Sequence, residues 1–274
     1  MEITARDRRL FKMLRDYALV ATSEIRKRIF DNIAKTTVLR RLRALEREKL
    51  IQKIPGSMAQ EFSWALTLKG AEVAKLEIYK RNFPLGLRAH DQKLVSLRFL
   101  LEDIGIAKSW VPDHEIRSSM AKKYGLRSMK KRLIPDALLG VMINGIATSI
   151  ALELELTIKA KSRYFKTFDL YSEKCEIKWI WYVVTHKSHV GILFRYFDDY
   201  RYLTAGKTFI VAVLDDLLAN GLNSKLYTPN AFKLSEIMQA SPTAHRVSSV
   251  GIETTPLQNH ANTENESLIL RETG

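Results

Sequence analysis

The sequence has few of the features that mark secreted or membrane-spanning proteins. Its 274 residues include a single cysteine, Cys175, which excludes a disulfide framework and a cysteine-based zinc site. No basic segment followed by an apolar one opens the chain, so we expect a cytoplasmic protein. The longest nearly uncharged run, residues 137–152, is shorter than a membrane span and contains Asn144-Gly145, a hairpin signal. A membrane partner is therefore not expected.

Acidic residues are outnumbered, and the imbalance is confined to one half of the chain. The sequence carries 44 Lys and Arg against 30 Asp and Glu, a formal charge of +14. Residues 1–134 hold 30 of the basic and 15 of the acidic side chains, a net charge of +15, and the remainder sums to −1. A strongly basic protein favours a polyanionic partner, either nucleic acid or an anionic surface. The asymmetry indicates that the first half of the chain binds the polyanionic partner.

The first 81 residues show the pattern of a winged helix-turn-helix domain. Thr4 and Asp7 form a capping signal before a first helix, and further helices are expected from Thr22 and over residues 35–49. Two short strands around a turn and a closing helix from Leu68 follow. Three helices and a hairpin in this order predict a DNA-binding domain whose third helix enters the major groove.

The third of these helices has two different faces. Leu39, Leu42 and Leu45 fall on one side at helical spacing. The candidate DNA-binding residues lie on the opposite side and in the wing: Thr36, Thr37, Arg40, Arg43, Arg47 and Lys53. Arginine can grip phosphate or the guanine edge, and threonine can contact phosphate or a thymine methyl. A merely solvated basic face, or a winged helix that binds protein, are the alternatives.

Residues 82–90 contain a Pro-Leu-Gly stretch and predict a linker to a second domain over residues 91–240. A basic segment inside that domain is expected to form a mobile loop around Gly125 that lies along a phosphate backbone. Its candidate DNA-binding residues are Lys122, Lys123, Arg127, Lys130, Lys131 and Arg132. A solvated loop without a partner is the alternative. Residues 241–274, rich in Ser, Thr, Asn and Glu, predict a disordered polar tail.

The most informative stretch surrounds Asn144-Gly145. A two-residue turn there pairs each residue with the one whose number makes the sum 289, which places Asp136 directly across from Glu153. Like charges opposed on neighbouring strands are destabilising, so something should offset them. One explanation is a divalent cation held by these carboxylates, and the other is a salt bridge from Lys159, Lys161 or a basic residue of the loop. The helices and strands that follow predict a mixed sheet flanked by helices.

These motifs together resemble the replication-relaxation family of plasmid replication and mobilisation proteins. The resemblance rests on the winged helix, a helix opening at His90 and a short set of motif residues. Those residues are Pro135, Asp136, Ala137, Glu153, Glu155 and Thr157. It implies double-stranded DNA as the partner, together with other replication or mobilisation proteins. A homodimer is a further expected partner, because many winged helices bind paired half-sites.

The second domain also looks like the PD-(D/E)xK restriction-endonuclease fold. The expected fold class is therefore α+β: a winged helix-turn-helix followed by a restriction-endonuclease-like mixed-sheet α/β domain. In that fold an Asp and a Glu hold Mg²⁺, which implies Asp136 and Glu153 as ligands with Glu115 as an additional one. The motif lysine is replaced by Glu155, and Lys159 could reach the cluster only if the chain bends after Thr157.

Three functions follow from this pattern. The leading interpretation is a double-stranded DNA-binding protein that binds through its winged helix, with a degenerate nuclease-like second domain and with Mg²⁺ as the only candidate cofactor. A Mg²⁺-dependent nuclease or nickase, with Asp136, Glu153, Glu155 and Lys159 as its catalytic set, is the second. The third is a transcriptional regulator whose second domain binds a partner.

Overall fold

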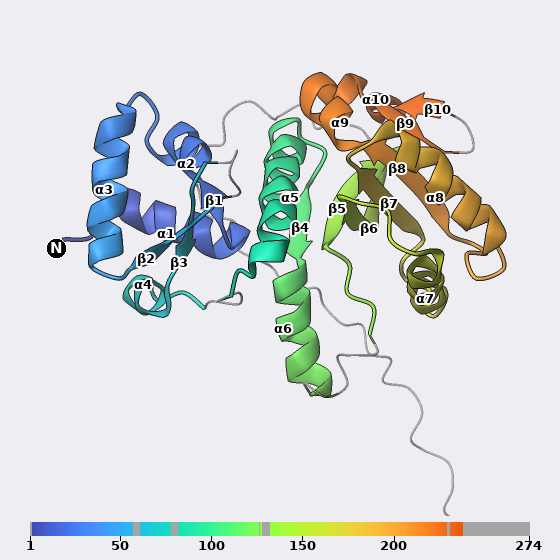
Figure 1. Cartoon of the computed structure of the whole chain (residues 1–274), viewed down its shortest axis with the longest axis horizontal. Coiled ribbons are helices and arrows are strands. Elements are labelled where there is room, and N and C mark those ends of the chain that lie inside the picture. The colour runs from blue at the N-terminus through green and yellow to red at the C-terminus, as the bar shows by residue number, and fades with distance from the viewer. Residues whose placement is uncertain are drawn as a thin grey trace, which may run out of the picture. The chain divides into compact units, whose positions relative to one another are not determined.

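The computed structural model describes residues 2–56, 61–77, 82–125, 127, 132–228 and 231–237. The predicted polar tail lies outside the described residues, as do the tip of the wing and both Lys130 and Lys131. The described part is a mixed α+β structure with two sheets (Figure 1).

The N-terminal elements follow the predicted order. They are α1 (Ala5–Tyr17), β1 (Val20–Ala21), α2 (Thr22–Ile29), α3 (Lys35–Arg47), β2 (Ile51–Ile54), β3 (Ser63–Leu66) and α4 (Leu68–Ala74). The capping box predicted at the start of α1 forms, because the Thr4 side chain accepts from the Asp7 N–H and Asp7 accepts from the Thr4 N–H. The strands form a three-stranded antiparallel sheet in the order β1-β3-β2. The two-residue strand β1 was not predicted from the sequence.

One apolar core holds these helices and strands together. Leu42 and Leu45 of α3 are fully buried in it and Leu39 is partly buried, which confirms the predicted inner face of this helix. Trp64 of β3 is 2% exposed, and its indole N–H donates to the Thr22 hydroxyl at 3.0 Å. Packing against α1, α2 and the sheet therefore fixes the orientation of α3.

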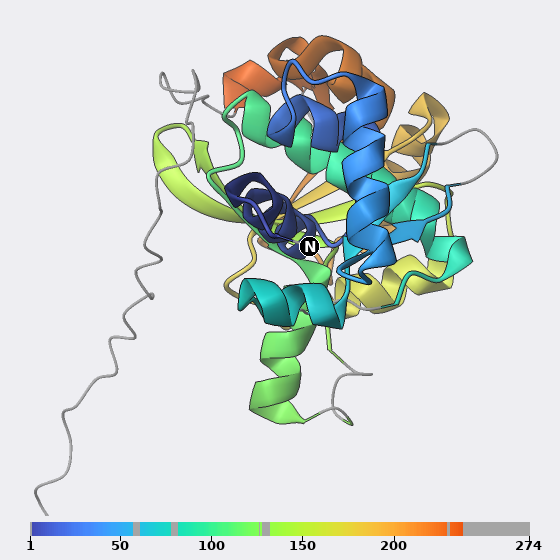
Figure 2. The same cartoon turned by 90° about the vertical axis from the view of Figure 1, so that its left-hand side faces the viewer.

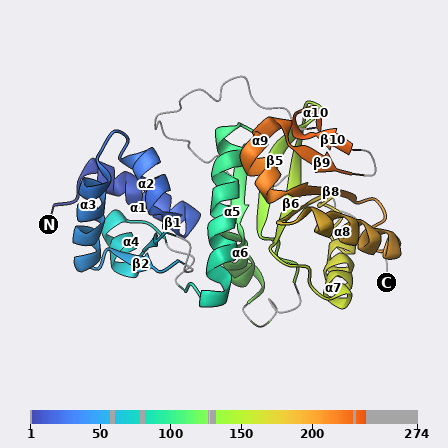
Figure 3. The same cartoon turned by 45° about the horizontal axis from the view of Figure 1, so that its top comes forward.

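Helix α5 (Leu85–Asp103) lies between the N-terminal elements and the large sheet (Figures 1 and 3). It begins inside the range expected as a linker. Phe99 is buried in the N-terminal core, whereas Leu97 and Leu101 are buried against the large sheet. The helix thus contributes to both cores.

The large sheet has seven strands in the order β10-β9-β8-β7-β6-β5-β4. Its strands are β4 (Ser109–Pro112), β5 (Ala137–Ile143), β6 (Ile146–Glu155), β7 (Trp179–Val184), β8 (Thr208–Val213), β9 (Lys225–Tyr227) and β10 (Ala231–Lys233). Strands β6, β7 and β8 run parallel to one another, and the other pairings are antiparallel. This is the mixed sheet that the sequence predicts.

The sheet is covered by helices on both faces. They are α5, α9 (Leu214–Asn220) and α10 (Leu234–Ile237) on one side, and α7 (Lys161–Ser172) and α8 (Lys187–Asp199) on the other, with a short 3-10 turn η2 (Gly221–Asn223) after α9. Figure 3 shows this layering from above. Among the described helices, none is both long enough and apolar enough to cross a bilayer.

The predicted hairpin register is correct. Ala137 pairs with Leu152 and Ile143 with Ile146, as the two-residue turn requires. Both turn residues have positive φ, 49° at Asn144 and 79° at Gly145. The register also places Ile143 and Ile146 on one face with Ala137, Leu139, Val141, Ile150, Leu152 and Leu154, which are buried, but Ile146, at the turn, is 69% exposed.

The expected mobile loop around residues 117–125 is instead a helix, α6 (Asp113–Tyr124), which projects away from the rest of the described chain (Figure 2). It ends at Gly125, whose φ of 78° favours glycine. Glu115 therefore lies in the first turn of α6 and not at the end of a strand. The loop prediction failed because the sequence of α6 shows no clear apolar stripe, with His114 and Ile116 as its buried residues.

Candidate nucleic-acid interface and acidic cluster

Helix α3 presents the predicted polar face to solvent. The exposed residues include each candidate on this helix: Thr36, Thr37, Arg40, Arg43 and Arg47. Of these, the three arginines make no hydrogen bond or ion pair with any residue that the structure describes. An arginine without a protein partner keeps all its donors for a ligand, and an exposed guanidinium suits phosphate and guanine edges.

Arg41 lies on the same helix, but its side chain pairs with residues of the protein. Its Nε donates to Asp7 Oδ1 at 2.9 Å, and its Nη2 donates to Asp7 Oδ2 and to the Glu2 carbonyl. Asp7 is fully buried. Burial opposes ionisation of Asp7, but the hydrogen bonds from Arg41 and Thr4 outweigh it and lower the pKa of Asp7. Helical spacing already leaves Arg41 off the predicted outer face, but it does not identify Asp7 as its partner.

The remaining predicted DNA-binding residues are spread over the wing and α6. Lys53 on β2 is exposed, and its Nζ lies 3.4 Å from the centre of the Phe62 ring. Lys122 and Lys123 are exposed in the last turn of α6, with Lys122 Nζ 3.8 Å from Glu77 Oε2. Arg127 is exposed too. Arg132 stacks on an aromatic ring, with its guanidinium carbon 3.6 Å from the centre of the Tyr124 ring.

Asp136 comes directly before β5, and its side chain accepts a hydrogen bond from the backbone of β6. Its Oδ2 accepts from the Leu154 N–H at 2.8 Å. Proline 135 precedes it, and the backbone ladder between β5 and β6 begins at Ala137. The carboxylate therefore satisfies a strand N–H that the ladder leaves without a backbone acceptor.

The same carboxylate oxygen meets His90 in the first half of α5. His90 Nε2 lies 3.1 Å from Asp136 Oδ2 and 3.2 Å from the Leu154 carbonyl. Both neighbours accept hydrogen bonds, so Nε2 carries the proton. The other ring nitrogen lies 3.7 Å from Asp91 Oδ1. Burial lowers the pKa of His90, but the hydrogen bonds with Asp136 and Asp91 outweigh it and raise that pKa to about 10.

Glu153 faces the helices on the opposite side of the sheet from His90. The hydroxyl of Tyr171, on α7, donates to its Oε1 at 2.6 Å. Burial and the charge of Asp136 raise the pKa of Glu153 to about 8. Burial likewise raises the pKa values of Tyr171 and Tyr182 well above their ordinary range. Burial thus favours the neutral form of Glu153.

Glu155 ends β6 and pairs with Lys159. The chain bends at Leu156 and Thr157, and Lys159 Nζ returns to within 2.8 Å of Glu155 Oε1. The bend that the sequence required for Lys159 to reach the cluster is therefore present. Glu155 is 4% exposed, and burial raises its pKa although Lys159 opposes this. Lys161 points elsewhere and pairs with Asp199 at 2.7 Å.

A cleft of about 1200 Å³ opens beside this cluster, between α5, α6 and the end of β6. The titratable residues that line it are His90, Asp91, Asp113, His114, Arg117, Lys122, Asp136, Glu155, Lys159 and Arg163. Glu153 and Glu115 do not line it. The structure thus brings Asp136, Glu155 and Lys159 to one cleft, whereas Glu153 lines a smaller cavity of about 210 Å³ that it shares with Glu155 and Lys159.

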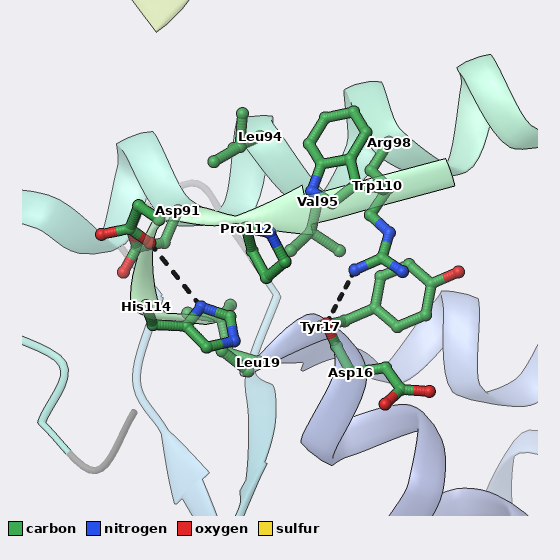
Figure 4. A pocket seen from close by; sticks show the side chains of 12 residues that line it. Asp16, Tyr17, Leu19, Asp91, Leu94, Val95, Arg98, Trp110, Pro112 and His114 are labelled. Atoms are coloured by element: carbon green, nitrogen blue, oxygen red, sulfur yellow. Dashed lines mark hydrogen bonds and ion pairs between the residues drawn. The ribbon is translucent and has the colours of Figure 1, made fainter. Parts of the chain in front are cut away.

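A different, very small cavity of about 30 Å³ lies where α1 meets α5 and β4 (Figure 4). Arg98 dominates it: its Nη1 donates to the Asp16 carbonyl at 2.7 Å, and its guanidinium carbon lies 3.9 Å from the centre of the Tyr17 ring. Tyr17 also stacks on Phe99, with ring centroids 4.3 Å apart. Because side chains fill this site, it serves packing between the helices and offers no room for a ligand.

Sequence reasoning missed His90 as part of the acidic cluster and Tyr171 as the partner of Glu153. His90 entered the resemblance only as the opening of a helix, and it is 46 residues from Asp136. Within the described ranges, no three His, Cys, Asp or Glu side chains are grouped so that they could hold a metal ion. Comparisons of the chain with protein-family models, curated proteins and solved structures found no match.

Proposed function

We propose that the chain is a cytoplasmic double-stranded DNA-binding protein whose N-terminal elements act as a winged helix-turn-helix. The observation that carries the proposal is the exposed face of α3, where Arg40, Arg43 and Arg47 have no partner among the described residues. Three helices and a three-stranded sheet place this face opposite the domain core, which leaves it accessible to a major groove. The net charge of +15 on residues 1–134 supports the same partner.

The contrast between neighbouring arginines on α3 argues against a merely solvated face. The Arg41 side chain forms an ion pair with Asp7, whereas the Arg40 and Arg43 side chains have no partner among the described residues. Threonines at 36 and 37 extend the same face with small hydrogen-bonding groups. An arginine and threonine surface of this kind offers contacts to both phosphates and bases.

We propose that the second domain is an endonuclease-like fold that assists binding. The support is the position of Asp136 at the start of β5 beside Glu153 and Glu155 at the end of β6, as the resemblance implies. Lys122 and Lys123 on the projecting α6 would add phosphate contacts. The resemblance to replication-relaxation proteins is the basis for assigning the binding to plasmid replication or mobilisation.

Fluorescence anisotropy with labelled duplex DNA tests the assignment of α3. We compare the wild-type chain with Arg40→Ala/Arg43→Ala and with a matched control, Arg195→Ala/Arg201→Ala. The control removes the same charge from exposed arginines that also lack described partners, on and after α8.

If both α3 arginines contact phosphates, the slope of log affinity against log salt should fall by about 2 in the first variant. It should stay unchanged in the control. Equal binding by wild type and the α3 variant would show that α3 is not the DNA-contacting helix. Equal weakening of both variants would show that the interaction depends on net charge alone.

A further inference from the structure

The resemblance to PD-(D/E)xK nucleases implies a Mg²⁺ site, and the acidic cluster can be tested for it directly. A divalent cation needs several oxygen atoms with free lone pairs that converge on one point. Of the ligands that the resemblance implies, Asp136 and Glu153 belong to the cluster together with Glu155, whereas Glu115 lies on α6. Each carboxyl group of the cluster already has a partner inside the protein.

The Asp136 oxygen nearest the cluster has two donors. Oδ2 accepts from the Leu154 main chain at 2.8 Å and from His90 Nε2 at 3.1 Å. The imidazole stands on the side of the carboxylate that faces the cleft, because His90 lines this cleft together with Asp136. A metal that used Oδ2 would have to displace the His90 side chain.

The two glutamates are turned to different partners. Glu155 Oε1 accepts from the Lys159 ammonium at 2.8 Å, and the Glu155 side chain is 6% exposed. Glu153 Oε1 accepts from the Tyr171 hydroxyl at 2.6 Å, in a small cavity that Glu155 and Lys159 also line. One oxygen of each carboxyl group is therefore already engaged, in keeping with the finding that the described residues contain no metal-holding group of three. The residues present do not fit a Mg²⁺ ion.

We infer that His90 and Lys159 close the acidic cluster to divalent cations, and that these side chains take the structural place of a metal. The inference concerns the second domain and does not depend on DNA binding by α3. Lys159 supplies a positive charge next to Glu155, and His90 supplies a hydrogen-bond donor to Asp136. Together they offset the repulsion that opposed carboxylates on β5 and β6 would otherwise cause.

This arrangement also gives each of the two side chains a positioning role. His90 links α5 to the end of the β5–β6 ladder through Asp136 and the Leu154 carbonyl. Lys159 holds the bend after β6 against Glu155, just before α7 begins at Lys161. A metal would connect these same segments through shared ligands. Here the His90–Asp136 hydrogen bond and the Lys159–Glu155 ion pair connect these segments directly.

Calorimetric titration of the full chain with Mn²⁺ tests the inference, with Asp136→Asn/Glu155→Gln as the reference variant. Asparagine keeps an oxygen that accepts from the Leu154 N–H, so the strand end remains satisfied, and far-UV circular dichroism checks folding. We expect the same isotherm for both proteins. A saturable site in the wild-type chain that the reference variant lacks would overturn the inference. A site present in both lies outside the cluster and leaves the inference standing.

A second variant tests whether His90 and Lys159 are what closes the cluster. In His90→Ala/Lys159→Ala the carboxylates of Asp136 and Glu155 lose their side-chain partners, and we expect a new saturable Mn²⁺ site. A double variant that folds, by circular dichroism, and gains no site would show that another feature closes the cluster. Nicking of supercoiled plasmid by the wild-type chain with Mn²⁺, absent in Asp136→Asn/Glu155→Gln, would also overturn the inference.

Discussion

Arg40 and Arg41 are adjacent on α3, and the structure predicts opposite effects when each is replaced by alanine. Arg40 is exposed without a described partner, whereas Arg41 makes a two-pronged ion pair with the fully buried Asp7. Arg41→Ala should therefore destabilise the fold. Arg40→Ala should weaken DNA binding and leave stability unchanged.

The size of the effect follows from the burial of the pair. Removal of one partner from a fully buried ion pair costs about 3–5 kcal/mol. The Arg41 side chain is 27% exposed, and Asp7 keeps its hydrogen bonds from Thr4, so both facts reduce the loss. We expect the free energy of unfolding to fall by about 2 kcal/mol. For a chain of this size the melting temperature should fall by about 4–8 °C.

Urea denaturation followed by tryptophan fluorescence measures this difference, because Trp64 is buried in the N-terminal core. Each variant removes one positive charge, so an effect of net charge alone would be equal in both. Since the pKa of Asp7 is lowered from 3.8 in the folded state, its pairing stabilises the protein above pH 3.8. That contribution is lost as the pH falls through the lower folded value. Equal midpoints for the two variants, or a difference that persists in strong acid, would refute the reasoning.

Two further changes probe packing and proton binding. Gly70→Ala should cost about 3 kcal/mol or more by denaturant titration, because its Cβ would lie 2.0 Å from the Leu50 carbonyl oxygen, which also accepts from the Thr67 hydroxyl. The control Gly86→Ala meets no atom within 4 Å and should not destabilise the protein. Glu153→Gln should flatten the decline in unfolding free energy as the pH rises from 4.5 to about 8, because folded Glu153 keeps the proton that the unfolded chain releases near 4.5. Equal pH slopes, measured by urea titration at several pH values, would contradict that assignment.

The hairpin could be predicted from sequence because its turn is local. Asn144 and Gly145 both accept positive φ, and a two-residue turn fixes the register of every pair behind it. Helix α6 could not be predicted in this way. Its sequence combines lysines with a following glycine and lacks a clear apolar stripe, so the periodicity that identifies a helix is missing.

The acidic residues and Lys159 of the candidate site were predictable from the sequence, whereas His90, Tyr171 and the pattern of contacts were not. The register placed Asp136 next to Glu153, and the need for a bend before Lys159 was evident from spacing. Which oxygen meets which donor depends on contacts between distant segments, such as His90 with Asp136. The alternation of a strand places Glu153 and Glu155 on one face, but only the packing of α7 decides that Tyr171 takes the first of them.

Helix α5 has contacts of two kinds at its two ends. Toward its C-terminal end, Glu102 accepts from the Tyr17 hydroxyl, and Asp103 Oδ2 accepts from Arg28 Nη2 at 2.6 Å. In its first half, His90 contacts Asp136. His90 and Glu102 are separated by about 18 Å along a helix with a rise of 1.5 Å per residue. One continuous helix therefore bonds to α1 and α2 near its C-terminal end and to Asp136, which precedes β5 of the large sheet, in its first half.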